Sequence, residues 1–497
     1  MKKAMKKLMA ALLAVAMVCA MAIPAWAAVD ITSHTFEAYQ IFAGDLNEGT
    51  LSNVKWGSNV TDPASFLNAL KAANTAYDAC TDAKGVAEAL SEHNDLANAF
   101  AKIAATHVTG TPAATGTGSV TLPSAGYYLI VDTTDVTDGH DAKNLSLLKV
   151  SSATTVTPEV KTDIPTLEKK VQDKNDSTDY TSDWQDSADY DIGDTIPYKL
   201  TATLGNLDNF DNYYVKFVDT MTNLTYVTNS ATVKINNTTL EPSEYNLSWD
   251  GTSKTLEIEI TDVKTLGART NSVITVEYKA TLDASANIGS AGNPNFAHLI
   301  FSNNPNGNGY GKTAPDKNIV FTYKVVANKI DQDDKPLAGA AFALYKKLPS
   351  VPTDGTSHIT EGTDAYALVE QLNVNANGEV ADKELTTFEW TGIDDGEYMI
   401  KEIITPAGYN SIEPIKFTVT ADHQIEADDP KFTALTGGDD FTGEVSTGTL
   451  TTKIENRMGS TLPGTGGIGT TIFYVVGGGL MAAAAILLIT KKRMENR

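Results

Sequence analysis

The 497-residue sequence is poor in cysteine and in positive charge, and both shortages exclude classes of protein. It has two cysteines, and its 38 Lys and Arg residues stand against 62 Asp and Glu residues, giving a formal net charge of −24. Proteins that hold nucleic acid by its backbone need clustered Lys and Arg, so no nucleic-acid partner is expected. The seven histidines are scattered without metal-ligand spacing, and no G-x-S-x-G motif is present. We therefore expect no metal, no cofactor and no enzymatic activity.

Residues 1–27 have the pattern of a secretory signal peptide. Four lysines lie within the first seven residues, and an apolar stretch runs from Leu8 to Ile23. Ala25-Trp26-Ala27 then supplies the small-x-small pattern of a cleavage site. The apolar stretch is short, which favours a cleaved signal over a retained signal anchor.

Residues 458–497 predict an anchoring tail. No charged residue occurs from Met458 to Thr490, and the apolar part, residues 470–490, is long enough to cross a bilayer core. Lys491-Lys492-Arg493 follows at once, which the positive-inside rule places in the cytoplasm. The bulk of the chain is therefore expected to be secreted and held at the cell surface, inserted in the membrane as a precursor.

Export changes what the cysteine count means. Residues 1–27 and 466–497 carry eight of the 38 basic residues and one of the 62 acidic residues, so the remaining chain has a net charge of −31. Cys19 leaves with the signal peptide, so Cys80 cannot form an intramolecular disulfide. Exported multidomain proteins normally use disulfides where they can, so this one must be stabilised in another way.

Three units lie between the two ends, and most of their sequence alternates with the two-residue period of β-strands. The first, residues 28–160, has strand-like ends and an Ala-rich part at 63–105 with helical spacing. The second, 161–325, and the third, 326–457, have short strands at regular turn spacing, with a short helix expected at Ala365–Leu372. The pattern predicts a mainly β protein of three tandem β-sandwich domains, the first with some helix.

The strongest local motif is Leu462-Pro463-Gly464-Thr465-Gly466, directly before the apolar span and the basic tail. The combination resembles the LPXTG cell-wall sorting signal of Gram-positive surface proteins. The resemblance implies that a sortase cleaves between Thr465 and Gly466, holds the Thr465 carbonyl as a thioester and passes it to an amine. It also implies a final place in the cell wall, attached to peptidoglycan.

The third unit contains VVANKIDQDDKPLAGAAFALYKK, GEYMIKEIITPAGYN and TTKIENRMGS, and it resembles the prealbumin-like, CnaB-type domain of SpaA-type surface proteins. Alternation places Lys329, Glu402 and Asn456 each on the face that its apolar neighbours would bury. Three such groups in one core are costly without a mutual arrangement. In the family that arrangement is a self-formed Lys–Asn isopeptide bond. The resemblance implies Lys329 as nucleophile, Asn456 as acceptor and Glu402 as proton shuttle.

The second unit resembles the middle domain of Gram-positive pilus backbone subunits, an Ig-like sandwich of CnaA type, through PTLEKKV, DIGDTIPYKLTATL, VKFVDTM and NPNFAHLIFSNNPN. Alternation favours Lys169 over Lys170 as the buried amine and makes Asp219 the candidate acid. Asn295 is in phase with the apolar residues that follow it and is the favoured acceptor. Asn303 has the same parity and stays open as an alternative.

The first unit resembles the N-terminal domain of such subunits through HTFEAYQIFAGDL and LSNVKWGSNV. Its opening segment, Ile31–Phe36, has no lysine, so no isopeptide bond is expected there. Backbone pilins carry the lysine that joins subunits at the next junction, directly after a proline. Here two residues separate Pro158 from Lys161, so the match is displaced, but Lys161 lies in a proline-bracketed linker and is the predicted acceptor.

Taken together, these features predict the structural backbone subunit of a sortase-assembled pilus that supports adhesion. Thr465 of one subunit would be joined to Lys161 of the next. The expected partners are a sortase, identical subunits in a covalent polymer and peptidoglycan, with minor pilins and host ligands as further candidates. The alternative is an LPXTG-anchored adhesin displayed as a single chain.

Overall fold

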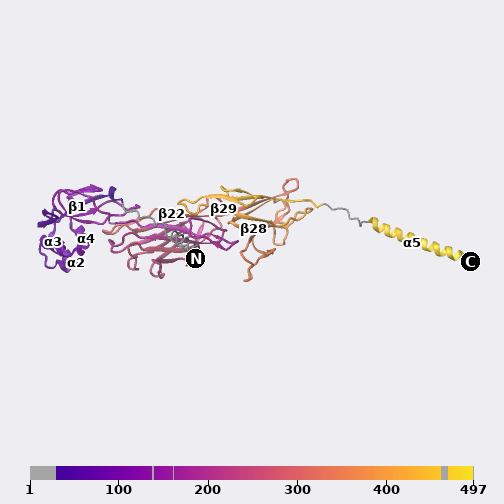
Figure 1. The fold of residues 1–497 in the computed structure, drawn as a ribbon, viewed down its shortest axis with the longest axis horizontal. Helices are drawn as coiled ribbons and strands as arrows, with labels where there is room; N and C mark the ends of the chain where they lie inside the picture. The colour runs from indigo at the N-terminus through magenta and orange to yellow at the C-terminus, as the bar shows by residue number, and fades with distance from the viewer. Residues whose placement is uncertain (1–29, 137–138, 161, 460–467, 496–497) are drawn as a thin grey trace, which may run out of the picture.

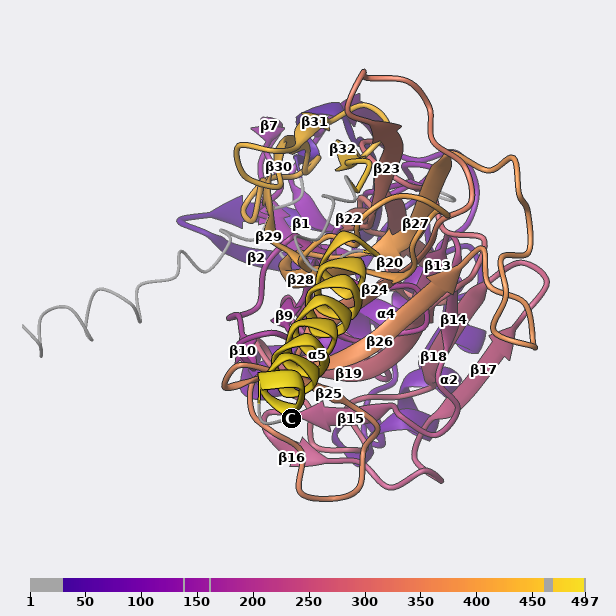
Figure 2. The same cartoon turned by 90° about the vertical axis from the view of Figure 1, so that its right-hand side faces the viewer.

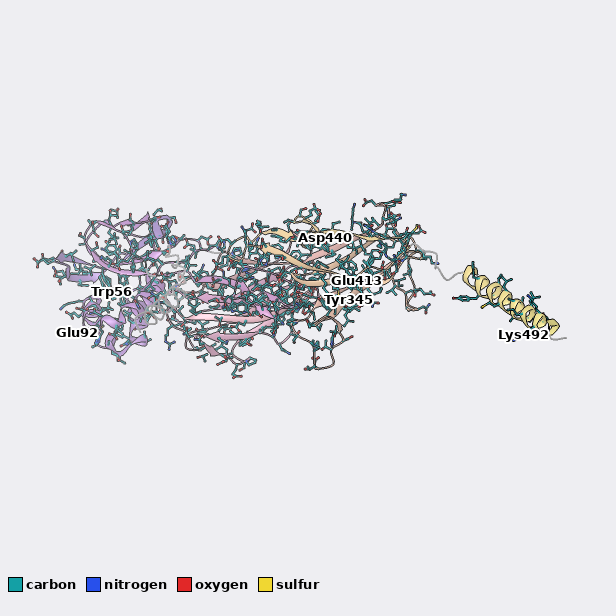
Figure 3. The ribbon with its side chains drawn as sticks, turned by 45° about the vertical axis from the view of Figure 1, so that its right-hand side comes forward. Trp56, Glu92, Tyr345, Glu413, Asp440 and Lys492 are labelled. Atoms are coloured by element: carbon teal, nitrogen blue, oxygen red, sulfur yellow. The ribbon has the colours of Figure 1, made fainter. Side chains whose placement is uncertain are left out.

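The computed structural model describes residues 30–136, 139–160, 162–459 and 468–495. Three β-rich domains follow one another along a rod (Figure 1). Trp56 and Glu92 lie in the first domain, and Tyr345, Glu413 and Asp440 lie in the third (Figure 3). Figure 2 looks along the rod from the side of the C-terminal helix. The expected mainly β, three-domain architecture is confirmed.

The described part of the first domain combines a five-stranded sheet and the two-stranded pair β4-β7 with three α-helices. Its elements are β1 (Thr35–Asn47), β2 (Thr50–Trp56), α2 (Pro63–Ala73), α3 (Ala83–Glu92), α4 (Ala97–His107), β3 (Ala114–Thr117), β4 (Val120–Thr121), β5 (Gly126–Asp132), β6 (Leu147–Ser151) and β7 (Thr155–Val156). The sheet order is β2-β1-β5-β6, with β3 beside β1. Asp62 and Asp82 cap α2 and α3 by accepting from main-chain N–H groups, which fixes where each helix begins. The Ala-rich part is helical, as predicted.

The middle domain is a sandwich of two sheets whose strands are mostly antiparallel. Its elements are β8 (Thr166–Val171), β9 (Lys174–Asn175), β10 (Tyr180–Thr181), β11 (Ser187–Asp189), β12 (Thr195–Thr203), β13 (Val215–Met221), β14 (Leu224–Tyr226), β15 (Thr232–Ile235), β16 (Thr238–Thr239), β17 (Asn246–Asp250), β18 (Thr255–Ile260), β19 (Val273–Leu282), β20 (Asn293–Ser302), β21 (Tyr310–Lys312) and β22 (Asp316–Phe321). One sheet has the order β16-β15-β19-β12-β8 and the other β11-β22-β20-β13-β18-β17. Burial alternates along β12 and β19, because every second side chain faces the opposing sheet.

The third domain packs two sheets, β27-β23-β32-β31 and β25-β26-β24-β28-β29-β30. Its elements are β23 (Tyr323–Asp331), β24 (Ala341–Lys347), β25 (Ile359–Glu361), β26 (Asp364–Leu372), β27 (Thr387–Ile393), β28 (Gly396–Ile404), β29 (Ile415–His423), β30 (Phe432–Thr436), β31 (Thr442–Glu444) and β32 (Thr449–Asn456). The short helix expected at Ala365–Leu372 is wrong, because this segment is strand β26. Pairing with both β24 and β25 overrides its local helical pattern.

The two joints of the rod differ in chemistry. In the first domain, Phe42 and Leu129 pack on the helices, whereas Phe36 and Ile130 belong to an apolar core that continues into the middle domain. At the second joint the two main chains almost touch. A Cβ on Gly289, whose φ is +81°, would lie 2.4 Å from a main-chain nitrogen across the joint, so a side chain is excluded there.

The apolar helix expected at the C-terminal end is α5 (Ile468–Glu495). Its segment Phe473–Lys492 has a mean hydropathy of 2.1 and none of it is buried. By length and composition this helix could cross a membrane.

Candidate cross-linking sites

The middle-domain candidates come from facing sheets. Lys169 lies on β8, whereas Asp219 and Asn295 lie on the neighbouring strands β13 and β20 of the other sheet. All three side chains are fully buried. Strand alternation turns each of them into the sandwich, so residues far apart in sequence meet in its interior.

Tyr278 on β19 lies at the centre of this group. Its hydroxyl accepts from Lys169 Nζ at 2.9 Å and from Asn295 Nδ2 at 2.9 Å, and donates to Asp219 Oδ2 at 2.8 Å. Lys169 Nζ also donates directly to Asp219 Oδ2. The structure therefore brings Lys169, Asp219 and Asn295 around one hydroxyl.

Two buried oxygens of the middle-domain group, Asp219 Oδ1 and Asn295 Oδ1, have no hydrogen-bond partner among the described residues. A buried unpaired polar atom is costly, so such atoms call for an explanation. Burial also lowers the pKa of Lys169, although the charge and hydrogen bond of Asp219 oppose this. The site thus combines the Lys169 amine, whose neutral form is favoured by burial, with the Asn295 side-chain carbonyl, which accepts no hydrogen bond from the described residues.

The alternatives that the sequence left open lie elsewhere. Lys170 points to the outside of the sheet and donates to Asp186 Oδ1 at 2.7 Å. Asn303 is buried, but its Nδ2 donates to the main-chain oxygens of Val136 at 3.0 Å and Asp141 at 3.2 Å, at the joint with the first domain. The geometry therefore favours Lys169 and Asn295.

The third-domain candidates lie on the first and last strands and on the facing sheet. β23 and β32 are parallel neighbours, with Lys329 paired to Ile454, so Asn456 falls two positions along the same face. Lys329 and Asn456 are 1% and 0% exposed. Glu402 reaches them from β28 across the sandwich, and both of its oxygens accept from Asn456 Nδ2, at 2.9 and 3.1 Å.

The amine and the amide of the third domain are held separately. Lys329 Nζ donates to the main-chain oxygens of Ile330 at 2.9 Å and Ile454 at 3.0 Å, while Asn456 Oδ1 has no partner. Burial lowers the pKa of Lys329 to about 8, against the opposing charge of Glu402. A substantial fraction of this amine is therefore neutral near pH 8, next to an unsatisfied amide carbonyl.

The first domain has a histidine where the other two have a lysine near the opening strand. His34 is fully buried, with Nδ1 2.6 Å from Asp132 Oδ2 and Nε2 2.9 Å from Asp141 Oδ2. Burial lowers the pKa of His34, but the hydrogen bonds and charges of the two carboxylates outweigh it and raise the pKa above its usual value. This group is a histidine–carboxylate network, in which Asp132 Oδ2 also accepts from the main-chain N–H of Asn144 at 2.7 Å.

We expect His34→Asn to destabilise the first domain by about 2 kcal/mol below pH 6, where the imidazolium bridges two carboxylates. Because the folded-state pKa is raised, this stabilisation is full below the unfolded pKa and is lost as the pH rises through the folded pKa. Amide hydrogen exchange of the first domain from pH 5 to 9 measures the effect. The exposed His93→Gln serves as control, and a variant with the wild-type pH profile would contradict the assignment.

Two further groups of predicted residues lie outside the described residues. They are Lys161 and the motif Leu462 to Gly466. Next to Lys161, the side chain of Val160 is 41% exposed and that of Thr162 is buried. The signal peptide, residues 1–27, also lies outside the described part.

Sequence reasoning missed two features of these sites. Tyr278 shares the inward phase of Val276 and Ala280 in SVITVEYKATL, so alternation could have found it. A dense group of carboxylates at the joint of the middle and third domains carries no local signal, because its members are up to about 220 residues apart in the chain.

Comparison with known proteins agrees with this architecture. Residues 323–431 match the family model described as SpaA, prealbumin-like fold domain. The chain is 32% identical over 160 residues to the trypsin-resistant surface T6 protein of Streptococcus pyogenes serotype M6, a match that covers 29% of this chain and 25% of that protein. The chain thus spans only about a quarter of the length of this curated relative.

Solved structures show a related fold. The T6 backbone pilin of serotype M6 Streptococcus pyogenes, described as a modular three-domain structure with variable loops and extensions, has a TM-score of 0.51 and 19% identity, over 87% of this chain and 97% of that one. The major pilin SpaD of Corynebacterium diphtheriae has a TM-score of 0.43 and 18% identity, over 86% and 94% of the two chains. The predicted similarity to SpaA-type and backbone-pilin proteins is confirmed.

Proposed function

We propose that this chain is the structural backbone subunit of a covalently polymerised, cell-wall-anchored pilus. One observation carries the proposal: two successive domains of a rod each bury a lysine and an asparagine beside a carboxyl group, which is buried in the middle domain and half-buried in the third. Such groups stabilise a fold only if they satisfy one another. The similarity of the fold to a backbone pilin over most of the chain supports the same conclusion.

In each of these two domains we propose a spontaneous isopeptide bond, Lys169–Asn295 in the middle domain and Lys329–Asn456 in the third. The neutral lysine Nζ attacks the asparagine Cγ, the new C–N bond forms, and the amide nitrogen leaves as ammonia. Asp219 or Glu402 donates a proton to the leaving amide nitrogen and takes up the proton that the attacking Nζ loses, so the carboxyl group is regenerated. Fixed contact inside the core replaces the high concentration that free amines and amides would need.

Polymerisation would use the sorting motif. A sortase cysteine attacks the Thr465 carbonyl and Gly466 leaves with its amine. The Lys161 Nζ of the next subunit then attacks the thioester and releases the cysteine thiol. The last subunit would be passed to a peptidoglycan amine instead, and α5 would hold the precursor in the membrane before cleavage.

Export of the full chain with a pilus-class sortase in a Gram-positive host tests the function. We expect a ladder of covalent oligomers that survives boiling in detergent, and we expect Pro463→Ala in the sorting motif to abolish it. The unaltered chain exported without the sortase is the control. A single wall-linked species and no ladder would contradict the pilus and favour an adhesin displayed as a single chain.

A further inference from the structure

The joint between the middle and third domains gathers two groups of carboxylates with different surroundings. The first, Asp176, Asp191, Asp194 and Asp394, surrounds the ammonium of Lys346. That ammonium donates to Asp394 at 2.5 Å and to Asp191 at 2.9 Å. This group therefore has a cation of its own.

In the described part of the chain, no Lys or Arg side chain forms an ion pair with the second group. It consists of Asp173, Asp189 and His423, whose ligand atoms, one per residue, lie within 4.8 Å of one another. Asp173 follows β8 and Asp189 ends β11, both in the middle domain, whereas His423 ends β29 in the third. The group thus spans the joint.

Asp189 of this second group is buried and Asp173 is half-buried, and each has a buried carboxylate oxygen without a hydrogen-bond partner among the described residues. Asp189 is 1% exposed, and no described residue forms a hydrogen bond with its Oδ2 or with the buried Oδ1 of Asp173. Burial and the negative charges of Asp173 and Asp395 raise the pKa of Asp189 well above its usual value, although the nearby Tyr323 hydroxyl and the charge of Lys346 oppose this. Desolvated carboxylates normally pair with a cation, and none of the described side chains forms an ion pair with Asp189.

The histidine presents a free ring nitrogen to this group. Ser187 Oγ donates to the main-chain oxygen of Gln424 at 2.7 Å, so its contact of 2.8 Å with His423 Nδ1 must accept a proton from the ring. This places a proton on Nδ1, so in the neutral ring the lone pair lies on Nε2, which is 3.6 Å from Asp173 Oδ2. That separation is too long for a good hydrogen bond.

The same separation suits a metal ion between the two atoms. Ligands about 2.0–2.1 Å from a tetrahedral Zn²⁺ lie about 3.4 Å from each other. A set of one imidazole and two carboxylates favours a transition metal over Ca²⁺ or Mg²⁺, which prefer oxygen alone. The hydrogen bond from Nδ1 to Ser187 is the support that metal-binding histidines usually have.

We propose that Asp173, Asp189 and His423 bind one divalent transition-metal ion, with Zn²⁺ as the best fit, and that this ion fixes the middle domain to the third. Zinc bridges the two domains because its ligands come from both. The site does not depend on polymerisation, so its failure would leave the proposed pilus function untouched.

The untagged full chain, solubilised in mild detergent and stripped with a chelator, tests the site by equilibrium dialysis against Zn²⁺, Mn²⁺ or Ca²⁺. We expect one Zn²⁺ per chain, with binding weakened at least about tenfold in Asp189→Asn and in His423→Gln. Zn²⁺ should also raise the unfolding temperature of the wild type and not of these variants. Asp194→Asn removes one carboxylate from the neighbouring group and should bind Zn²⁺ as the wild type does.

Asp189→Asn removes a buried carboxyl group and keeps the shape, so it should fold, and thermal unfolding with chelator checks this. The proposal is overturned if the wild type retains no Zn²⁺, or if Asp189→Asn and His423→Gln bind it as the wild type does. Loss of binding in Asp194→Asn alone would place the ion in the other group and overturn it too. Ca²⁺ binding that is insensitive to His423→Gln would have the same consequence.

Discussion

The intact mass of Lys329→Met should exceed that of the wild type by one ammonia, after correction for the mass difference between methionine and lysine. The same change should lower the unfolding temperature of the third domain by roughly 15 °C. The wild-type chain should lack two ammonia masses, one for each domain with a lysine–asparagine pair. Intact-mass spectrometry and calorimetry of the exported chain measure the two effects.

The size of the stability effect follows from chain entropy. The bond between Lys329 and Asn456 would close a loop of more than one hundred residues, and a cross-link over a loop of about 100 residues removes about 4.7 kcal/mol of unfolded-state entropy. Methionine fills nearly the same volume without a buried amine, so Lys329→Met isolates the cross-link from the desolvation cost. Asn456→Ala should be more destabilising, because it leaves that amine buried without its partner.

Glu402→Gln is the matched control for the chemistry. It keeps the shape and one acceptor oxygen for Asn456, but it has no proton to give, so the domain should fold without the bond and gain one ammonia mass. In the middle domain, Asn295→Ala should gain the same mass and Asn303→Ala should not. An unchanged mass deficit in Lys329→Met would assign the third-domain bond to other residues.

Strand alternation explains why the buried groups could be found in the sequence. Lys169, Asp219 and Lys329 each follow apolar residues at a spacing of two, and a side chain on that face has only the core to enter. The same rule could not choose between Asn295 and Asn303, which share a parity. That choice depends on which end of β20 faces the opposing sheet, and only the three-dimensional packing shows it.

The errors and omissions have equally physical causes. Residues 365–372 have no local feature that distinguishes a short helix from a strand, and pairing with β24 and β25 decides the matter. The group of Asp173, Asp189 and His423 arises from contact between domains. The alternation of side chains along a single strand cannot predict such a contact, because the contact depends on how two folded domains pack against each other.

The positions of the proposed bonds suggest a path for mechanical load. Between Lys161 and Thr465, tension would enter β8, cross from Lys169 to Asn295, continue through β22 into β23 and cross again from Lys329 to Asn456. Most of each sandwich would then be bypassed by a covalent link. The first domain precedes Lys161 and lies outside this path, and it is the domain for which no lysine–asparagine bond is predicted; its buried His34 instead contacts Asp132 at 2.6 Å.

Lys161→Arg should therefore abolish the covalent ladder formed with a pilus-class sortase and leave the folded subunit intact. Arginine keeps the positive charge, but it cannot serve as a neutral amine near neutral pH, so the thioester on Thr465 would find no acceptor in the next subunit. Immunoblots of wall extracts boiled in detergent measure the ladder. Lys149→Arg, an exposed lysine on the other side of the same junction, is the matched control and should polymerise as the wild type does.

The proposed load path adds a second consequence to the Lys161→Arg test, because the position of the acceptor lysine decides whether the first domain carries tension. If Lys161 is the acceptor, an unfolded or deleted first domain would not interrupt the shaft, and the two lysine–asparagine bonds would carry all the tension. If Lys161→Arg still forms the ladder and the acceptor maps to a lysine before residue 150, tension would pass through a domain held only by hydrogen bonds and His34. The first domain would then be the weakest element of the fibre, and both the acceptor assignment and the load path would be wrong.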